Sequence, residues 1–175
     1  MSEEAIKYLR RTESGVVTDS LGRLGLSGWM DYLLPVQPGV RIAGRAFTVK
    51  LAPKRGIGGS KENFYSLIRR AEPGDVLVIE ALGSDAWILG ENTVHAAEYR
   101  GLGGMVLDGR VRDVAEIRKI ALPVFSRGAA VRPHSPFLEL VDYGVPIRCA
   151  GAQVRPGDII VGDEDGAVVV PAERL

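Results

Sequence analysis

Pro73-Gly74-Asp75-Val76-Leu77-Val78-Ile79 is the segment that most strongly indicates the fold class. Its first three residues are typical of a tight turn, and every residue from 76 to 79 is apolar, as in a strand that is buried on both faces. Helices and further buried strands alternate after it. We expect a helix over 91–100 that ends at Gly101, a strand over 105–107, a helix over 114–120 and a strand over 123–126. This alternation predicts an α/β fold with a central region of parallel βαβ units.

The segments on either side are expected to be mixed before this region and rich in strands after it. Before it, the pattern predicts helices over 2–11 and 17–24, a strand over 41–52 in which Gly44 marks a bend or bulge, a glycine-rich loop over 54–60, and a helix over 61–70 that Ser60 caps. After it, strands are expected over 145–149, 159–161 and 167–170, and the start of a helix over 172–175. Residues 156–161 echo 73–78, which we interpret as a reused turn rather than a duplication.

Composition sets the broad class of protein. The chain has 175 residues, which favours one domain over 1–175. Lys+Arg and Asp+Glu both number 22, and no basic stripe is present, so we expect no nucleic-acid partner. One cysteine, Cys149, allows neither an internal disulfide nor a thiolate metal cluster. Because residues 1–11 have no apolar signal core and no stretch is long enough to span a bilayer, we expect no membrane association and a cytoplasmic location.

Two polar segments hold the candidate chemistry. Gly90-Glu91-Asn92-Thr93 lies at a predicted helix start, where free backbone N–H groups can bind an anion. Arg112 and Asp113 follow a buried strand, at the kind of strand end where α/β proteins bind ligands. An arginine fork suits a carboxylate or enolate oxygen, and a carboxylate can hold a hard cation. On residue type alone, the plainer alternative is favoured, in which Asp113 caps the next helix and Arg112 pairs at the surface.

Other motifs favour structural interpretations. Glu91, His95 and Glu98 share one helical face, which we interpret as a solvated or subunit-facing polar stripe rather than a metal face. The loop 56–61 lacks the spacing of a phosphate loop. Residues 163–166 read as an acidic turn between strands, because a calcium loop would need a later glutamate ligand. His134 lies in a proline-flanked loop and is expected at the surface, within possible reach of a substrate's distal carboxylate.

The two polar segments resemble the family of the regulator of ribonuclease E activity A, which includes the class II 4-hydroxy-4-methyl-2-oxoglutarate aldolases and is often mislabelled demethylmenaquinone methyltransferase. The family shows an acidic residue, twenty intervening residues and then Arg-Asp; here Glu91 precedes Arg112-Asp113 at that spacing. The similar stretches also include Thr18-Asp19-Ser20-Leu21-Gly22-Arg23, Pro73-Gly74-Asp75-Val76, Asp108-Gly109-Arg110-Val111 and Arg155-Pro156-Gly157-Asp158 through Asp165-Gly166. The likeness therefore spans roughly residues 15–171.

The resemblance implies a swivelling β/β/α fold that assembles as a homotrimer or a hexamer of two trimers. It implies that Asp113 ligates a divalent cation, Mg2+ or Mn2+, that Glu91 holds a water on that metal, and that Arg112 contacts the keto oxygen of a small 2-oxo acid substrate. Backbone N–H groups of Gly90, Glu91, Asn92 and Thr93 would take the substrate carboxylate. The implied activity is a metal-dependent carbon–carbon lyase that cleaves a 4-hydroxy-2-oxo acid to release pyruvate, with oxaloacetate decarboxylation as a companion activity.

The chain departs from the family pattern in two ways, and two other functions have to be weighed against the lyase. The acidic position is often Asp in the family and is Glu91 here, which reaches one methylene further. The carboxylates that some aldolases take from a neighbouring subunit have no match in this chain. The alternative function within the family is a non-catalytic protein-binding regulator of a ribonuclease. A true methyltransferase is rejected, because no glycine-rich cofactor loop follows a first strand.

Overall fold

The structure is a computed structural model that describes residues 3–55 and 60–174. Its helices are α1 (Glu3–Arg11), α2 (Ser14–Arg23), α3 (Phe64–Arg70), α4 (Glu91–Arg100) and α5 (Val114–Ile117), with a 3-10 turn η1 (Ala172–Arg174). Its strands are β1 (Trp29–Met30), β2 (Leu34–Pro35), β3 (Ile42–Pro53), β4 (Val76–Glu80), β5 (Trp87–Leu89), β6 (Gly104–Leu107), β7 (Arg110–Val111), β8 (Val124–Ser126), β9 (Leu138–Tyr143), β10 (Ile147–Cys149), β11 (Ala152–Val154), β12 (Ile159–Asp163) and β13 (Gly166–Val170).

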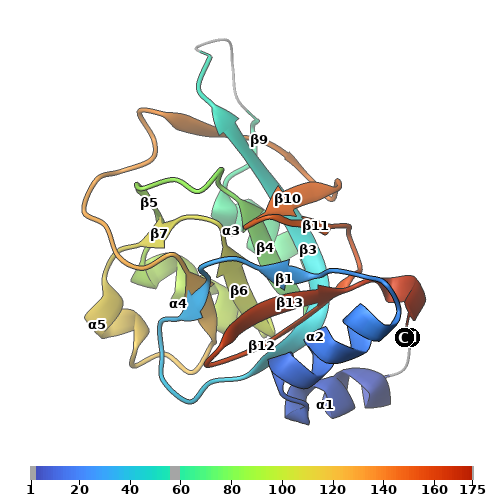
Figure 1. Ribbon diagram of the computed structural model, residues 1–175. Helices are drawn as coiled ribbons and strands as arrows, with labels where there is room; N and C mark the ends of the chain where they lie inside the picture. Colours follow the sequence, from blue (N-terminus) through green and yellow to red (C-terminus); the bar gives the residue numbers. More distant parts are fainter. Residues whose placement is uncertain (1–2, 56–59, 175) are drawn as a thin grey trace.

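The main sheet runs in the order β1-β13-β12-β3-β4-β6-β8-β2, and β9 also pairs with β3 (Figure 1). Strand β4 pairs in parallel with β3 and β6, and β6 pairs in parallel with β8. Leu77 and Ile79 of β4 pack into the core beneath α3 and α4, whereas Val76 and Val78 pack on the opposite face. Both faces of this strand are therefore buried, which explains its unbroken apolar run and confirms the predicted βαβ region.

The 12-residue strand β3 belongs to both halves of the sheet. Its first residues, Ile42 to Arg45, pair antiparallel with β12, and Ala46 to Lys50 pair in parallel with β4. Gly44 lies where β3 passes from one partner to the other. A Cβ at Gly44 would come within 2.9 Å of Val76 Cγ2, so this crossing requires glycine. The register shift of β3 lies later, between Lys50 and Leu51, opposite β9.

Two similar turns feed the strands that flank β3. Gly74 and Gly157 both adopt φ 87°. Asp75 Oδ2 accepts from Glu72 N at 3.0 Å, and Asp158 Oδ2 accepts from Arg155 N at 2.8 Å. The sequence echo noted above therefore corresponds to one turn geometry that starts β4 on one side of β3 and β12 on the other.

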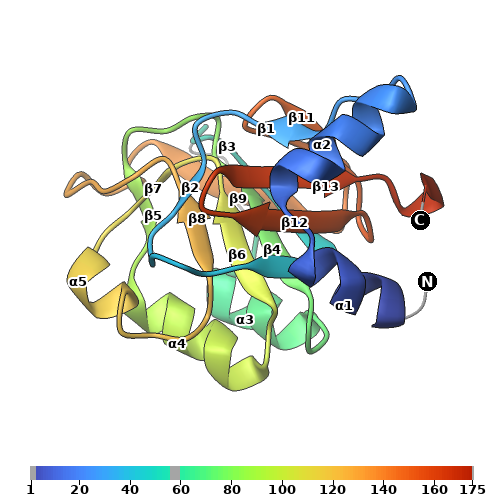
Figure 2. The same ribbon diagram turned by 60° about the horizontal axis from the view of Figure 1, so that its bottom comes forward.

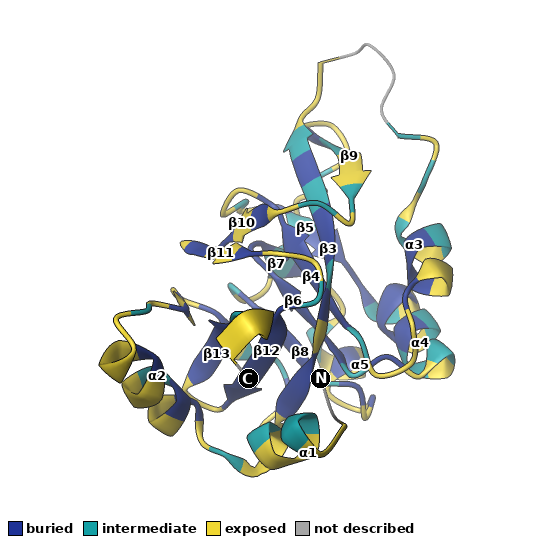
Figure 3. Cartoon of the chain, turned by 90° about the vertical axis from the view of Figure 1, so that its right-hand side faces the viewer, coloured by how far each residue is buried: buried dark blue, intermediate teal, exposed yellow. Residues whose placement is uncertain are grey.

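Helices cover the sheet in two places. Helices α3 and α4 lie together beneath β4 and β6, with exposed outer faces (Figures 2 and 3). Helices α1 and α2 lie at the other end, against β12 and β13, where Val17 and Leu21 pack on Val161 and Val168. No helix within the described residues is long and apolar enough to cross a membrane.

Some boundaries differ from those expected. Ser60 does not cap α3; the helix begins at Phe64, because Asn63 accepts from Ser66 N and Ser66 Oγ accepts from Asn63 N in a capping box. Helix α5 ends at Ile117 rather than at residue 120. The acidic turn is confirmed, since Asp163 pairs with Gly166 at the tip of the β12–β13 hairpin. The predicted loop residues 56–59, and residues 2 and 175 at the expected helix ends, lie outside the described residues.

Candidate active site

A small parallel pair, β5 and β7, brings the two predicted segments together. Leu89 pairs with Val111, and Arg112 N donates to Leu89 O at 3.1 Å. Glu91 follows β5 and Asp113 follows β7, so both segments leave from the carboxyl ends of adjacent parallel strands. Ligands bind at this position in parallel α/β architecture. The chain between Glu91 and Arg112 forms helix α4, which leads away from β5, and then strand β6, which leads back to β7.

Gly90 lies against the Arg-Asp pair without an intervening side chain. Its backbone is extended (φ −135°, ψ −171°), so conformation alone does not demand glycine here. A Cβ at this position, however, would collide with Asp113 Oδ2 and lie 2.9 Å from Arg112 Nε. A larger residue here would therefore displace the side chains of Arg112 and Asp113, and the absent side chain lets the start of α4 meet both directly.

Asp113 adopts a left-handed backbone conformation with φ 60° and ψ 36°. Its Oδ2 accepts from Glu91 N at 3.4 Å and lies 3.3 Å from Arg112 Nε. Although Asp113 precedes α5, its side chain makes no capping hydrogen bond. The expectation that the Asp113 side chain caps the helix is therefore wrong, whereas the expected surface pairing of Arg112 is present, with Asp113 as its partner. Asp and Asn tolerate this conformation better than most residues, and such outliers gather at functional sites.

Arg112 stacks on an aromatic ring that the sequence did not single out. Its guanidinium carbon lies 4.1 Å from the centre of the Trp87 ring. Trp87 N donates to Arg132 O at 2.8 Å, and Trp87 O accepts from His134 N at 3.2 Å. The planar guanidinium suits this stacking, which restricts where Arg112 can point.

His134 also packs against Trp87 and is partly buried, instead of lying free at the surface. The two rings meet edge to face at 5.6 Å, and His134 Nδ1 lies 3.0 Å from Trp87 O. Burial outweighs this contact and holds the pKa of His134 below its ordinary value. The lowered pKa favours the neutral imidazole.

The other predicted binding residues lie along the first turn of α4. Glu91 is partly exposed, Asn92 is exposed and Thr93 is buried. Thr93 N donates to Gly90 O at 3.1 Å, while the Glu91 N–H points at Asp113. Further along α4, Glu98 accepts from Ala121 N at 3.0 Å and lies 3.5 Å from His95 Nδ1, as expected for a structural polar stripe.

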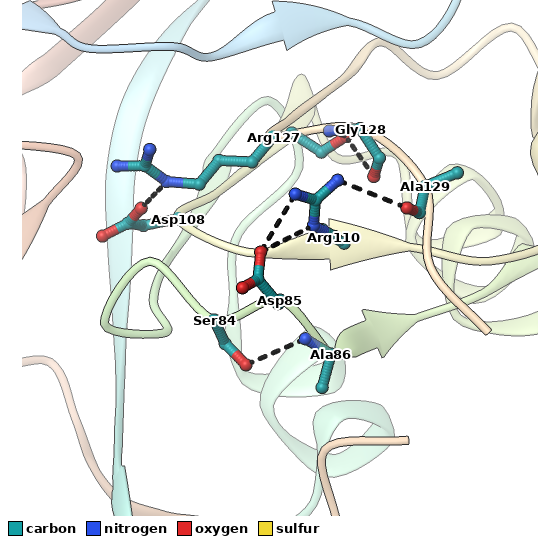
Figure 4. A network of polar contacts seen from close by, with 9 residues as sticks. Ser84, Asp85, Ala86, Asp108, Arg110, Arg127, Gly128 and Ala129 are labelled. Carbon is teal, nitrogen blue, oxygen red and sulfur yellow. Dashed lines mark hydrogen bonds and ion pairs between the residues drawn. The ribbon is translucent and has the colours of Figure 1, made fainter. Parts of the chain in front are cut away.

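A second polar network lies beside this pair of strands (Figure 4). Arg127, which follows β8, bonds to the buried Asp108, which follows β6. Arg110 Nε and Nη2 bond to Asp85 Oδ1 at 3.1 and 2.9 Å, and Arg110 Nη1 reaches Ala129 O at 3.5 Å. Asp108 and Arg110 lie within the predicted motif, whereas the only signal in the sequence for Arg127 is its place after a predicted strand.

The donor set at this site fits a hard divalent cation held largely by water. Asp113 offers a carboxylate whose side chain is 37% exposed. No cluster of three or more His, Cys, Asp or Glu side chains placed to hold a metal occurs within residues 3–55 and 60–174. Mg2+ commonly binds proteins through one or two carboxylates and keeps several waters, so a single exposed aspartate is compatible with it.

Comparison with known proteins identifies the family. Residues 15–169 match the family model described as RraA-like, Aldolase/RraA. A Halalkalibacterium halodurans protein, provisionally named 4-hydroxy-4-methyl-2-oxoglutarate aldolase, is 32% identical over 98% of this chain and 80% of its own length. The 4-hydroxy-4-methyl-2-oxoglutarate aldolase of Thermus thermophilus is 29% identical over 75% of this chain and 76% of its own length.

A solved structure agrees with these relatives. Streptomyces coelicolor RraAS2, described as an unusual member of the RNase ES inhibitor RraA protein family, superposes with a TM-score of 0.91 at 30% identity. The alignment covers 99% of this chain and 87% of that one. The mixed central sheet and strand-rich C-terminal part are thus the RraA fold, as expected. On the matched residues and on the fold together, this chain belongs to the RraA-like family.

Proposed function

We propose that this protein is a divalent-metal-dependent lyase that cleaves a 4-hydroxy-2-oxo acid and releases pyruvate, with oxaloacetate decarboxylation as a companion activity. The observation that carries the proposal is the close approach at Gly90, which places Arg112, Asp113 and the first turn of α4 around one point. The names of the two aldolase relatives support the same reaction class.

Each residue has a role that follows from its place. The N-terminal end of the ten-residue helix α4 favours the substrate carboxylate. Glu91 N already donates to Asp113 and Thr93 N to Gly90 O, so the proposed donors are the N–H groups of Gly90 and Asn92. Arg112, held by Trp87, donates to the keto oxygen. Its fixed charge stabilises the negative charge that develops there during cleavage.

The reaction needs no oxidant or reductant. The C4 hydroxyl gives up its proton to water, the C3–C4 bond breaks, and C4 becomes the carbonyl carbon of the second product. The bonding electron pair passes to C3 as the pyruvate enolate, which then takes up a proton at C3. We assign to Glu91, at the entry to α4, the role of holding the water that carries protons.

The proposed cofactor is Mg2+ or Mn2+, with Asp113 as its protein ligand. Such a cation, when bound, supplies positive charge that polarises the keto group and stabilises the enolate. Asp113 is suited to hold it, because its Oδ2 is already oriented by Glu91 N.

A non-catalytic role as a ribonuclease regulator is the second candidate, and the similarity to RraAS2 favours it. The two candidates are separable at Asp113. A lyase needs the charge of this carboxylate, whereas a docking surface has no such requirement for a single exposed aspartate.

The test is pyruvate release from 4-hydroxy-4-methyl-2-oxoglutarate and from oxaloacetate, with Mg2+, with Mn2+ and with EDTA. Asp113→Asn is the most informative variant, because it removes only the charge of this side chain. Asparagine tolerates φ 60° and can still accept a hydrogen bond from Glu91 N. We expect kcat/KM to fall at least about a hundredfold in this variant and in Arg112→Ala.

Asp19→Asn, on an exposed position of α2, is the matched control and should retain wild-type activity. Metal-independent cleavage, or an Asp113→Asn variant as active as the wild type, would contradict the proposal. Binding of a ribonuclease that survives Asp113→Asn, without any lyase activity in the wild type, would support the regulator instead.

A further inference from the structure

Arg112 and Asp113 line an open hollow whose other lining residues are apolar. Its volume is about 730 Å³. Its lining residues are Trp87, Arg112, Asp113, Val114, Ala129, Ala130 and Val131. The first turn of α4, where the substrate carboxylate is proposed to bind, does not contribute to this lining. A substrate that spans both places would therefore put its distal half in the hollow.

Residues 129–131 form one wall of the hollow, and backbone hydrogen bonds join this segment and its neighbours to β5 and β7. Ala130 N donates to Val111 O at 2.9 Å, and Val111 N donates to Gly128 O at 2.9 Å. Beyond the wall, Trp87 N donates to Arg132 O at 2.8 Å. Val131 lies between these anchors with 96% of its surface exposed, so its side chain is open to a ligand.

No cation other than Arg112 is among the described residues that line the hollow. The nearby Arg110 is bonded to Asp85 through two nitrogens and to the Ala129 carbonyl through the third (Figure 4). Arg132 stacks over Phe137, 5.6 Å from the ring centre. A second carboxylate on the substrate would thus lie against methyl groups and the Trp87 ring, because the one cation of the lining, Arg112, is already assigned to the keto oxygen.

From this lining we infer that the preferred substrates are 4-hydroxy-2-oxo acids whose distal end is apolar, rather than dicarboxylates. This inference rests on the proposed lyase function. An alkyl chain gains favourable burial against Trp87, Ala130 and Val131, whereas a carboxylate there loses hydration without a compensating ion pair.

The decisive comparison uses 4-hydroxy-2-oxoheptanoate and 4-hydroxy-2-oxoheptanedioate. The two compounds share every reacting atom and differ only at the far end, where one has a methyl group and the other a carboxylate. Pyruvate release is measured for both in the metal-loaded protein. We expect kcat/KM to be at least about tenfold higher for the heptanoate.

Val131→Lys tests whether the wall causes the preference. A lysine there offers a charge to the distal carboxylate, so the ratio of the two kcat/KM values should shift about tenfold toward the heptanedioate. The same substitution at the exposed Val141 of β9, Val141→Lys, is the matched control and should leave the ratio at its wild-type value. A wild-type preference for the heptanedioate would overturn the inference, as would a ratio that Val131→Lys does not change.

Exchange of the pyruvate methyl protons for deuterium, followed by NMR, separates this inference from the proposed function. Pyruvate has no distal half, so its exchange reports the enolate chemistry alone. Exchange together with preferred cleavage of the dicarboxylate, or with cleavage of neither compound, defeats the inference but leaves the lyase site standing. Absence of metal-dependent exchange defeats the lyase function and the inference with it.

Discussion

Gly90 matters at the scale of single residues because of the side chain it lacks. Its extended backbone would accept alanine, yet the added methyl group would occupy space taken by Asp113 Oδ2 and the Arg112 side chain. Neither neighbour can move freely, since Arg112 stacks on Trp87 and Asp113 holds a left-handed backbone conformation. A mutation at this position should therefore act on geometry more than on folding.

Gly90→Ala is expected to lower kcat/KM for pyruvate release about a hundredfold, because misplacement of reacting groups by about 1 Å has that effect. The measurement is steady-state kinetics beside a urea unfolding curve. Gly22→Ala is the control, since this helical glycine of α2 has nothing within 4 Å of its added Cβ. Equal activity in the two variants would show that the approach at Gly90 is not needed.

Glu91, Arg112 and Asp113 could be selected from the sequence only through the resemblance to a family with this spacing, because residue type alone favoured a helix cap and a surface ion pair. Trp87 could not be selected in the same way. Its contact with Arg112 depends on the pairing of β5 with β7, and these strands have three and two residues, too few for a visible alternation of polar and apolar positions. The apolar segment 129–131 could not be selected either, because its place at the site depends on its hydrogen bond with Val111 of β7.

At the scale of elements, α2 is capped from across the fold. Its own N-cap residue, Glu13, makes no side-chain cap. Instead, the carboxylate of Asp163 in β12 accepts from Ser14 N at 2.8 Å and from Ser14 Oγ at 2.7 Å. Burial pushes the pKa of Asp163 upward, but these bonds and one from Asp165 N outweigh it and hold the pKa below its ordinary value.

Ser14→Ala should therefore lower the free energy of unfolding by about 2 kcal/mol at pH 7, the usual value of a hydrogen bond to a charged group. Because the folded-state pKa is lowered, the stabilisation is complete above the ordinary carboxyl pKa of about 4 and is lost as the pH falls through the folded value. The difference between variant and wild type should shrink by about pH 2. Urea unfolding at both pH values measures it.

Ser20→Ala is the control within the same helix, because Ser20 is exposed and its hydroxyl bonds only to Val16 O among the contacts seen. It should change stability by less than about 0.5 kcal/mol at either pH. Equal effects of the two variants at pH 7 would contradict the cap.

The end of α4 was predictable because Gly101, which adopts φ 81°, follows the helix directly in the sequence. The cap of α2 was not predictable, because it comes from Asp163, far from Ser14 in the sequence, and leaves no local signal.

At the scale of the whole molecule, the family resemblance predicts a homotrimer or a hexamer. Large apolar side chains are exposed in several parts of the fold, among them Trp29, Tyr32 and Tyr99, and a zero net charge does not oppose association. Sedimentation should show a species of about three or six times the 18.8 kDa chain mass. A species at the mass of one chain, at the concentration used for activity, would contradict the expected assembly.

The shared strand β3 has a consequence for how the molecule loses its structure. Since its first residues are bonded to β12 and its later residues to β4 and β9, separating either half of the sheet would strip hydrogen bonds from the other. The two halves therefore form one cooperative unit, of the kind whose amides exchange with solvent only through global opening. The pair of strands that carries Arg112 and Asp113 follows directly from β4 and β6, within that unit. Catalytic competence and the fold should then disappear in a single transition, without a stage in which the chain stays folded but the site has come apart.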